Sequence, residues 1–314
     1  MKYYIIILLS TLSFNFYAQN KTTPKDSLKN IIKLNTQAIK LNPNNAISYK
    51  VRAKAKLGLE DYKGALKDYD KAIELNPKYD SAYVGRGIAK EKLGDKNAID
   101  DFIKAAGLNP QNDIAYFNMG KVSFGLEDYS KAIDEFTKAI EANPKLAKAY
   151  VERAYAKRFF KDYNNALTDC NKAIELDSIN EWAYTVRGLV KESLRNYTAA
   201  IADYDKAIKI NPAYSRAYFH RGYSKNMLKD RKGAIDDFNK AIELDPNDKS
   251  PYNHRASLKE ELKDYDGAIK DYSKVIQLDP KHHHAYNHRG DCKYAIGDKS
   301  GACADWQKAI TLGS

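Results

Sequence analysis

Histidine and carboxylate side chains gather near the end of this 314-residue chain. His284 and His288 stand four residues apart and Asp291 follows three residues later, so the three share one face if the segment is helical. Imidazole and carboxylate groups are ligands of zinc and other transition metals. The simpler interpretation is that these are polar surface side chains. We favour it, and predict neither a metal nor a cofactor.

Cysteine thiols are a second source of chemistry. Cys292 and Cys303 would stand at one level of an antiparallel helix pair that turns between them, so a disulfide is feasible in an oxidising compartment. Helix axes lie about 8–10 Å apart, whereas the Cα atoms of a disulfide must come within about 7 Å. Two buried thiols are therefore the alternative. Cys170 is most simply a small buried side chain.

Known catalytic motifs are absent from the sequence. It contains no glycine-rich phosphate loop, no nucleophile elbow and no His-Glu-x-x-His pair. The main polar groups instead recur at fixed intervals, which is typical of a scaffold. We therefore predict that the chain is not an enzyme.

A 34-residue period runs through the chain and defines its repeats. A proline closes almost every repeat, and Ser178 replaces it in one. A period of about 20–50 residues indicates stacked supersecondary elements without a single central core. The closing prolines are Pro43, Pro77, Pro110, Pro144, Pro212, Pro246 and Pro280.

Small and aromatic residues recur at fixed positions of each repeat. Tyrosine stands at position 4, glycine or alanine at 8, alanine at 20, an aromatic residue usually at 24, and alanine or valine at 27. Positions 4 and 8 share one face of a first helix, and the other three share one face of a second. The small residues allow the two helices to pack closely as an antiparallel hairpin that turns near position 16.

This pattern closely resembles the tetratricopeptide repeat family over about nine-tenths of the chain. The resemblance implies an all-α, right-handed superhelical solenoid of antiparallel helix hairpins. Residues 1–18 read as a signal peptide, 19–25 as a disordered lead and 26–45 as an N-terminal capping half-repeat. Eight full repeats follow at 46–79, 80–112, 113–146, 147–180, 181–214, 215–248, 249–282 and 283–314.

The first residues have the features of a secretory signal. Lys2 precedes an apolar run that ends at Phe16, and Ala18 is a small residue suited to cleavage. The run is short for a membrane span. This opening resembles that of exported proteins of Bacteroidetes-type bacteria, which implies the periplasm or secretion, without stable membrane insertion once the signal is removed. An uncleaved anchor is the alternative.

The chain is basic, with a formal net charge of +11 and a pI near 9.2. Such a charge suits nucleic acids and anionic surfaces. The lysines, however, recur at fixed positions, including position 26 of all eight repeats, as duplication of one repeat would produce. We therefore expect no nucleic-acid partner.

Two positions depart from the family pattern. Position 7 is arginine in seven repeats, with Met119 in the other, and position 23 is acidic in all eight. In an antiparallel hairpin these positions face each other, which predicts a ladder of charge-assisted pairs such as Arg52 or Arg86 with Asp68. Pairing within one repeat or between neighbours is left open, and a solvated charged face is the alternative.

The resemblance places partner binding on a concave groove formed by the first helices. Residues at positions 2, 5, 6, 9, 12 and 13 face this groove and vary between repeats. Aromatic and arginine side chains dominate interface hot spots. Packing of some of them against a neighbouring hairpin is the alternative. The predicted groove contains Phe117, Asn118, Lys121, Lys148, Tyr155, Arg158, Trp182, Arg216, Phe219, His220, Tyr223 and Asn226.

We therefore expect a scaffold that binds a peptide or protein partner and assists assembly of an envelope or secretion complex. One alternative is a module that binds glycan or peptidoglycan fragments through the groove aromatics. Another is a structural homo-oligomer joined through the last repeat, which has no further helix to cover it.

Overall fold

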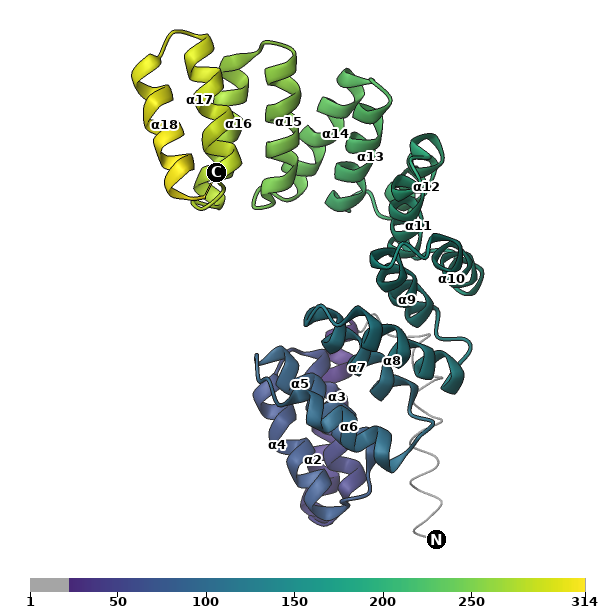
Figure 1. Cartoon of the computed structure of the whole chain (residues 1–314). Helices are drawn as coiled ribbons and strands as arrows, with labels where there is room; N and C mark the ends of the chain where they lie inside the picture. Colours follow the sequence, from purple (N-terminus) through teal and green to yellow (C-terminus); the bar gives the residue numbers. More distant parts are fainter. Residues whose placement is uncertain (1–22, 314) are drawn as a thin grey trace. The chain divides into compact units, whose positions relative to one another are not determined.

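The described residues of the computed structural model are 23–313, and they form seventeen helices and no strand. Consecutive helices pack as antiparallel pairs, and each pair packs against the next within two compact parts of the chain (Figure 1). The N-terminal module extends to Pro144, and the C-terminal module begins at Lys145. The predicted all-α architecture of helix hairpins is confirmed. The superhelical course of the whole chain stays a prediction.

The N-terminal module contains one single helix and three hairpins. The single helix α2 packs against α3, as expected for a half-repeat. The helices are α2 (Pro24–Leu41), α3 (Ala46–Gly58), α4 (Tyr62–Leu75), α5 (Asp80–Lys92), α6 (Ala98–Leu108), α7 (Asp113–Gly125) and α8 (Tyr129–Ala142).

The C-terminal module contains five hairpins. The first helices of its repeats carry odd numbers and the second helices carry even numbers. They are α9 (Ala147–Phe159), α10 (Tyr163–Leu176), α11 (Glu181–Ser193), α12 (Tyr197–Ile210), α13 (Ser215–Met227), α14 (Arg231–Leu244), α15 (Lys249–Glu261), α16 (Tyr265–Leu278), α17 (His283–Ala295) and α18 (Lys299–Thr311).

The prediction that residues 19–25 are disordered is wrong for residues 23–25. Thr23 caps α2 by accepting a hydrogen bond from the Asp26 backbone, and Pro24 and Lys25 belong to the first turn of that helix. Proline is favoured there because the first helical N–H groups have no partner within the helix. Residues 19–22 and the predicted signal 1–18 lie outside the described residues. Within residues 23–313, no helix combines the length and the apolar character needed to cross a membrane.

Each hairpin turns through one residue in the left-handed backbone region. At position 15 of all eight repeats φ lies between 58° and 90°, and only two of these residues, Gly94 and Gly297, are glycine. The next residue is the N-cap of the second helix in every repeat except the second, where Asn97 precedes α6. In the first repeat the Asp61 carboxylate accepts a hydrogen bond from the Gly64 backbone, where an added Cβ would lie 2.1 Å from the carboxylate. The same cap also forms where position 19 carries a side chain, because the Lys131 and Ala199 backbones donate to Asp128 and Asn196.

The core of most hairpins is an aromatic ring against a small residue, and Cys170 takes the place of the ring in one. The Tyr204 ring is fully buried, and a Cβ added to Gly188 would lie 2.5 Å from its Cε1 atom. Phe102 and Phe136 are likewise fully buried against Gly87 and Gly120. The aromatic residue at position 24 therefore fills the space that the small residue at position 8 leaves between the helices.

The predicted charge ladder is confirmed, and its pairs lie within single repeats. The Arg221 guanidinium donates to the Asp237 carboxylate from Nε at 2.9 Å and from Nη2 at 2.6 Å. Its Nη1 donates to Asp205 of the preceding repeat at 2.6 Å. Lys225, one turn further along α13, lies 2.8 Å from the same Asp237 carboxylate.

The same bidentate pair forms in all seven repeats that have the arginine. The expected alternative of Arg86 with Asp68 is wrong, because Arg86 pairs with Asp101 of its own repeat and reaches back only to Asp70. Each arginine also lies about 5.4–5.7 Å from the centroid of its position-4 tyrosine ring. The pairs are Arg52–Asp68, Arg86–Asp101, Arg153–Asp169, Arg187–Asp203, Arg221–Asp237, Arg255–Asp271 and Arg289–Asp305.

Candidate binding site

A pocket of about 320 Å³ opens on the C-terminal module, along the first helices of four consecutive repeats. Every lining residue stands at position 5, 6, 9, 12 or 13 of its repeat, where the sequence predicts side chains that face the groove. The lining residues are Arg158 of α9, Glu192 and Ser193 of α11, Phe219, His220 and Tyr223 of α13, and His254 of α15.

Arg158 supplies the cation of the pocket. Its guanidinium carbon lies 5.3 Å from the centroid of the Tyr155 ring and 5.1 Å from that of Phe159. Its Nε atom is buried and has no hydrogen-bond partner among the described residues. A planar guanidinium held between rings and short of an acceptor is suited to binding a carboxylate.

Glu192 supplies the anion, but its carboxylate is engaged elsewhere. Its Oε1 atom accepts a hydrogen bond from the Ser224 hydroxyl at 2.7 Å, and its Oε2 atom lies 3.6 Å from His220 Nδ1. The His220 ring stacks on Tyr204 with 5.8 Å between centroids and 25° between planes. Glu192 therefore fixes α13 and its histidine, and leaves Arg158 available to a ligand.

The far wall of the pocket is aromatic. Phe219 lies between two imidazole rings, at 4.9 Å from His220 and 5.3 Å from His254 between centroids. Burial, and then the neighbouring His220, lower the pKa of His254. At neutral pH its imidazole is therefore uncharged and offers one donor and one acceptor.

A second aromatic group borders Arg158. The Tyr155 and Trp182 rings meet edge to face, with centroids 5.2 Å apart. The Arg216 guanidinium carbon lies 5.3 Å from the centroid of the Trp182 ring, and the indole N–H donates to Glu152 at 3.2 Å. One face of Trp182 is therefore covered by arginine.

The structure separates the predicted groove residues into two groups. Arg158, Phe219, His220 and Tyr223 line the pocket together, and Tyr155, Trp182 and Arg216 border it. Lys148 is exposed and Asn226 is half-buried, and neither lines the pocket.

Phe117, Asn118 and Lys121 belong to the N-terminal module. Phe117 and Asn118 are buried, so the alternative of packing within the solenoid applies to them: the Phe117 ring lies 5.8 Å from Phe136. The Asn118 amide donates to the Ile114 carbonyl at 2.8 Å. Lys121 is exposed and its Nζ lies 3.0 Å from a Glu91 oxygen.

Three lining residues were not in the predicted set: Glu192, Ser193 and His254. Their positions, 12, 13 and 6, had been assigned to the groove. A choice of aromatic, basic and amide side chains passes over Glu192 and Ser193, and a choice limited to the third to sixth repeats passes over His254, whereas the position alone would have found all three.

The histidines and cysteines near the end of the chain are arranged differently from the expected pattern. His288 and Asp291 lie beside Glu260, whereas the His284 ring contacts His283 with centroids 4.0 Å apart. Cys292 and Cys303 are both free thiols, so the structure does not contain the disulfide considered from the sequence. Cys292 is buried and Cys303 exposed, whereas Cys170 is a buried free thiol, as expected.

Family models match most of the repeats. Models described as tetratricopeptide repeat match residues 114–146, 147–180, 215–248 and 250–282, and one described as TPR repeat matches 53–94 and 193–226.

Curated relatives match short stretches of the chain. Human serine/threonine-protein phosphatase 5 is 44% identical over 79 residues, which are 24% of this chain and 16% of the phosphatase. Hsc70-interacting protein 1 of Drosophila melanogaster is 41% identical over 64 residues, which are 20% of this chain and 17% of that protein. The matches thus span about a sixth of the length of these relatives.

A solved structure shares the fold over a longer stretch. A chain of the APC/C hetero-tetramer Cut9-Hcn1 superposes with a TM-score of 0.70 at 16% identity, over 85% of this chain and 54% of that chain. At this identity the likeness shows the fold alone.

Proposed function

Because this chain belongs to the tetratricopeptide repeat family, we propose that it is a non-enzymatic module that binds an extended segment of another protein along the first helices of its C-terminal module. The observation that carries the proposal is the pocket around Arg158. There, a buried guanidinium nitrogen that has no acceptor within residues 23–313 stands among aromatic rings.

The size and lining of the pocket suit part of a peptide. About 320 Å³ is at the small end of ligand pockets, so it takes one or two side chains of a longer segment. Arg158 would hold an acidic side chain or a terminal carboxylate, and Phe219 with Tyr223 would contact the apolar part of the same residue. The name of the Drosophila relative, Hsc70-interacting protein 1, describes a protein-binding role for that protein and supports the same class of function here.

The place of action that we propose is the periplasm or the cell exterior, in assembly of an envelope or secretion complex. This part of the proposal depends on the apolar start of the sequence between Lys2 and Ala18.

A glycan ligand is less well supported. Sugar rings bind to open aromatic faces, but Arg216 covers one face of Trp182, and Tyr155 meets the same indole edge to face. A glycan would have to displace Arg216 from Trp182, whereas a peptide carboxylate could accept a hydrogen bond from the Arg158 Nε atom, which has no acceptor among the described residues.

Selection from a random peptide display library on the full chain tests the proposal. We expect enriched peptides with an acidic residue, and at least tenfold weaker binding by Arg158→Met in fluorescence anisotropy, as for other hot-spot residues. Arg231→Met is the matched control, because this substitution removes the same charge from the second helix α14, outside the pocket. Equal losses in both variants, or enrichment without acidic residues, would contradict the proposal.

Three outcomes separate the alternatives. Binding of glycan fragments that is lost in Trp182→Ala, with no peptide selected, would favour the glycan module. Light scattering over a concentration series tests the homo-oligomer, which requires mass to rise with concentration. A monomer at every concentration would exclude it.

A further inference from the structure

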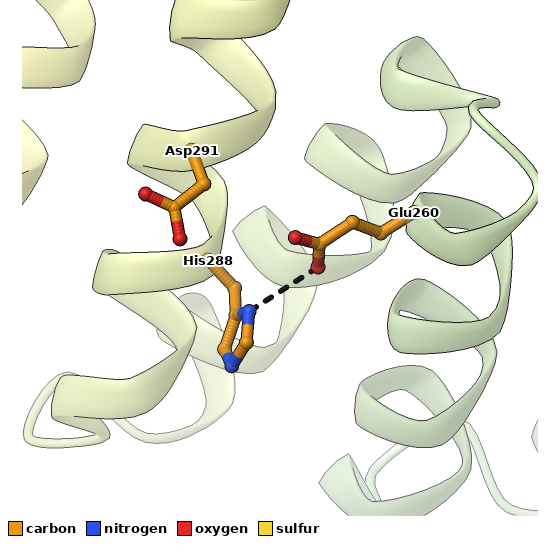
Figure 2. Close-up of side chains that lie close together, drawn as sticks. All are labelled: Glu260, His288 and Asp291. Carbon is orange, nitrogen blue, oxygen red and sulfur yellow. Dashed lines mark ion pairs between the residues drawn. The ribbon is translucent and has the colours of Figure 1, made fainter.

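Two carboxylates and an imidazole converge at the last two repeats. Glu260 of α15 and His288 and Asp291 of α17 each offer one ligand atom, and these atoms all lie within 4.8 Å of one another (Figure 2). Two of the ligands come from one helix and the third from the preceding repeat. None of these residues lines the pocket around Arg158.

The His288 contact has the distance, but not the geometry, of a hydrogen bond. Its Nδ1 atom lies 3.2 Å from Glu260 Oε2, yet this buried nitrogen has no hydrogen-bond partner among the described residues. Figure 2 shows the imidazole nitrogen facing the Glu260 carboxylate across the gap between α17 and α15. Such a nitrogen is available to a cation.

Other side chains hold both carboxylates in place. The Tyr272 hydroxyl donates to Glu260 Oε2 at 2.8 Å, and the Trp306 indole donates to Asp291 Oδ1 at 3.0 Å. The Tyr272 ring also stacks on His288, with 5.7 Å between centroids and 16° between planes. Donors of this kind orient metal ligands and raise the affinity of metal sites.

The separations suit a small divalent ion. Tetrahedral ligands about 2.0–2.2 Å from zinc lie about 3.3 Å from one another. The Glu260–His288 distance of 3.2 Å already meets this value. The Asp291 ligand atom is within 4.8 Å of the other two, so a shift of its exposed side chain would complete the set.

We propose that Glu260, His288 and Asp291 bind a divalent transition metal of the zinc class and thereby join the last two repeats. The imidazole selects against calcium and magnesium, which prefer oxygen ligands alone. This site is independent of the peptide pocket, and neither depends on the other.

The chain contains a natural comparison two repeats earlier. Glu192, His220 and Tyr223 occupy the same positions, 12, 6 and 9, and Glu192 lies 3.6 Å from His220. Tyrosine replaces the second carboxylate there. The comparison predicts metal binding at the last repeats and none at the earlier ones.

Calorimetric titration of the untagged full chain with zinc chloride tests the proposal. We expect one saturable site, weakened at least tenfold by Asp291→Asn and by Glu260→Gln, which keep the size of the side chains and remove their charge. His284→Ala and Cys303→Ser are the controls, because they remove nearby exposed ligands that are outside the triad. Both should retain the affinity of the original chain, and circular dichroism checks that each variant is folded.

Cobalt supplies a second readout. Absorption bands of bound cobalt without a thiolate charge-transfer band are expected for nitrogen and oxygen ligands. The proposal is overturned by the absence of saturable zinc binding, by unchanged affinity in Asp291→Asn, by loss of binding in His284→Ala, or by a thiolate band that Cys303→Ser removes.

Discussion

Replacing one acid of the charge ladder should destabilise its hairpin far more than the energy of an ordinary surface ion pair suggests. In Asp237→Asn the carboxylate becomes a neutral amide of similar size. Asp237 is 5% exposed, and both cations that it pairs with are mostly buried, Arg221 at 18% and Lys225 at 22% exposure. The substitution thus leaves two partly buried cations without their common anion, and Arg221 keeps only Asp205.

The expected cost is about 3–5 kcal/mol, the value for removal of one partner from a buried pair. An exposed pair would cost less than about 1 kcal/mol. Arg221→Met should cost less than Asp237→Asn, about 1.5–3 kcal/mol, because Lys225 still pairs with Asp237.

Glu135 provides the matched control. It is buried at the same position of another repeat, but Met119 and Ser123 replace the arginine and lysine that would face it. Its Oε2 atom has no hydrogen-bond partner among the described residues, and Lys138 lies 3.7 Å from its other oxygen. Glu135→Gln should therefore cost less than about 1 kcal/mol.

The assay is urea unfolding followed by circular dichroism, with hydrogen exchange of the α14 and α8 amides as a local measurement, since stacked repeats open separately. A cost below about 1 kcal/mol for Asp237→Asn would refute the buried-pair reasoning. Equal costs for Asp237→Asn and Glu135→Gln would show that loss of the charge, and not of its partners, sets the result.

The remaining predictions concern thiols, packing and pH. Ellman's reagent should modify Cys303 quickly in the native chain and Cys170 and Cys292 slowly, because burial raises the pKa of these two thiols to about 12. After unfolding without reductant, all three cysteines should react, and a single reactive thiol would prove a disulfide. Gly107→Ala should raise the free energy of unfolding by about 0.5–1 kcal/mol, since the added Cβ would meet nothing within 4 Å. Gly188→Ala should lower the free energy of unfolding, because its Cβ would lie 2.5 Å from the Tyr204 ring. A rise in both variants would contradict the packing argument. Because the pKa of His254 is lowered in the folded chain, the unfolded chain binds the proton at higher pH, and the free energy of unfolding should fall as pH drops below about 6.5. In urea titrations, His254→Asn should lessen this fall between pH 7.5 and 5.5. An unchanged dependence of the free energy of unfolding on pH would show that other groups cause it.

The fold follows from the sequence because each hairpin is specified locally and eight times over. The aromatic at position 24 and the small residue at position 8 pack within one hairpin, as Tyr204 and Gly188 do. The ladder was also predictable, since Arg221 and Asp237 face each other in the same hairpin. Its register was not, because an arginine side chain reaches both its own repeat and the one before.

Contacts between repeats are where prediction from periodicity ends. Helical spacing groups residues of one helix, which is why His284 was placed with His288. It gives no information on which side chain of α15 faces α17, and Glu260 was therefore not found. Phe117 was assigned to the groove for a similar reason: whether a ring at position 5 turns outward or packs on the position-24 ring, here Phe136, depends on the three-dimensional register.

The register also shows how one scaffold supports different chemistry. Position 12 of one repeat and positions 6 and 9 of the next meet on the first helices of adjacent repeats, at Glu192 with His220 and again at Glu260 with His288. The core residues around each meeting point are alike, and the ninth position is one of the groove positions that differ. Tyrosine there completes an aromatic wall beside Arg158, and aspartate there completes a set of metal ligands. Asn226 and Asn287 also stand where Arg158 and Phe219 stand two repeats earlier, so a few groove side chains distinguish the proposed peptide surface from the proposed metal site, while the hairpins beneath keep their packing.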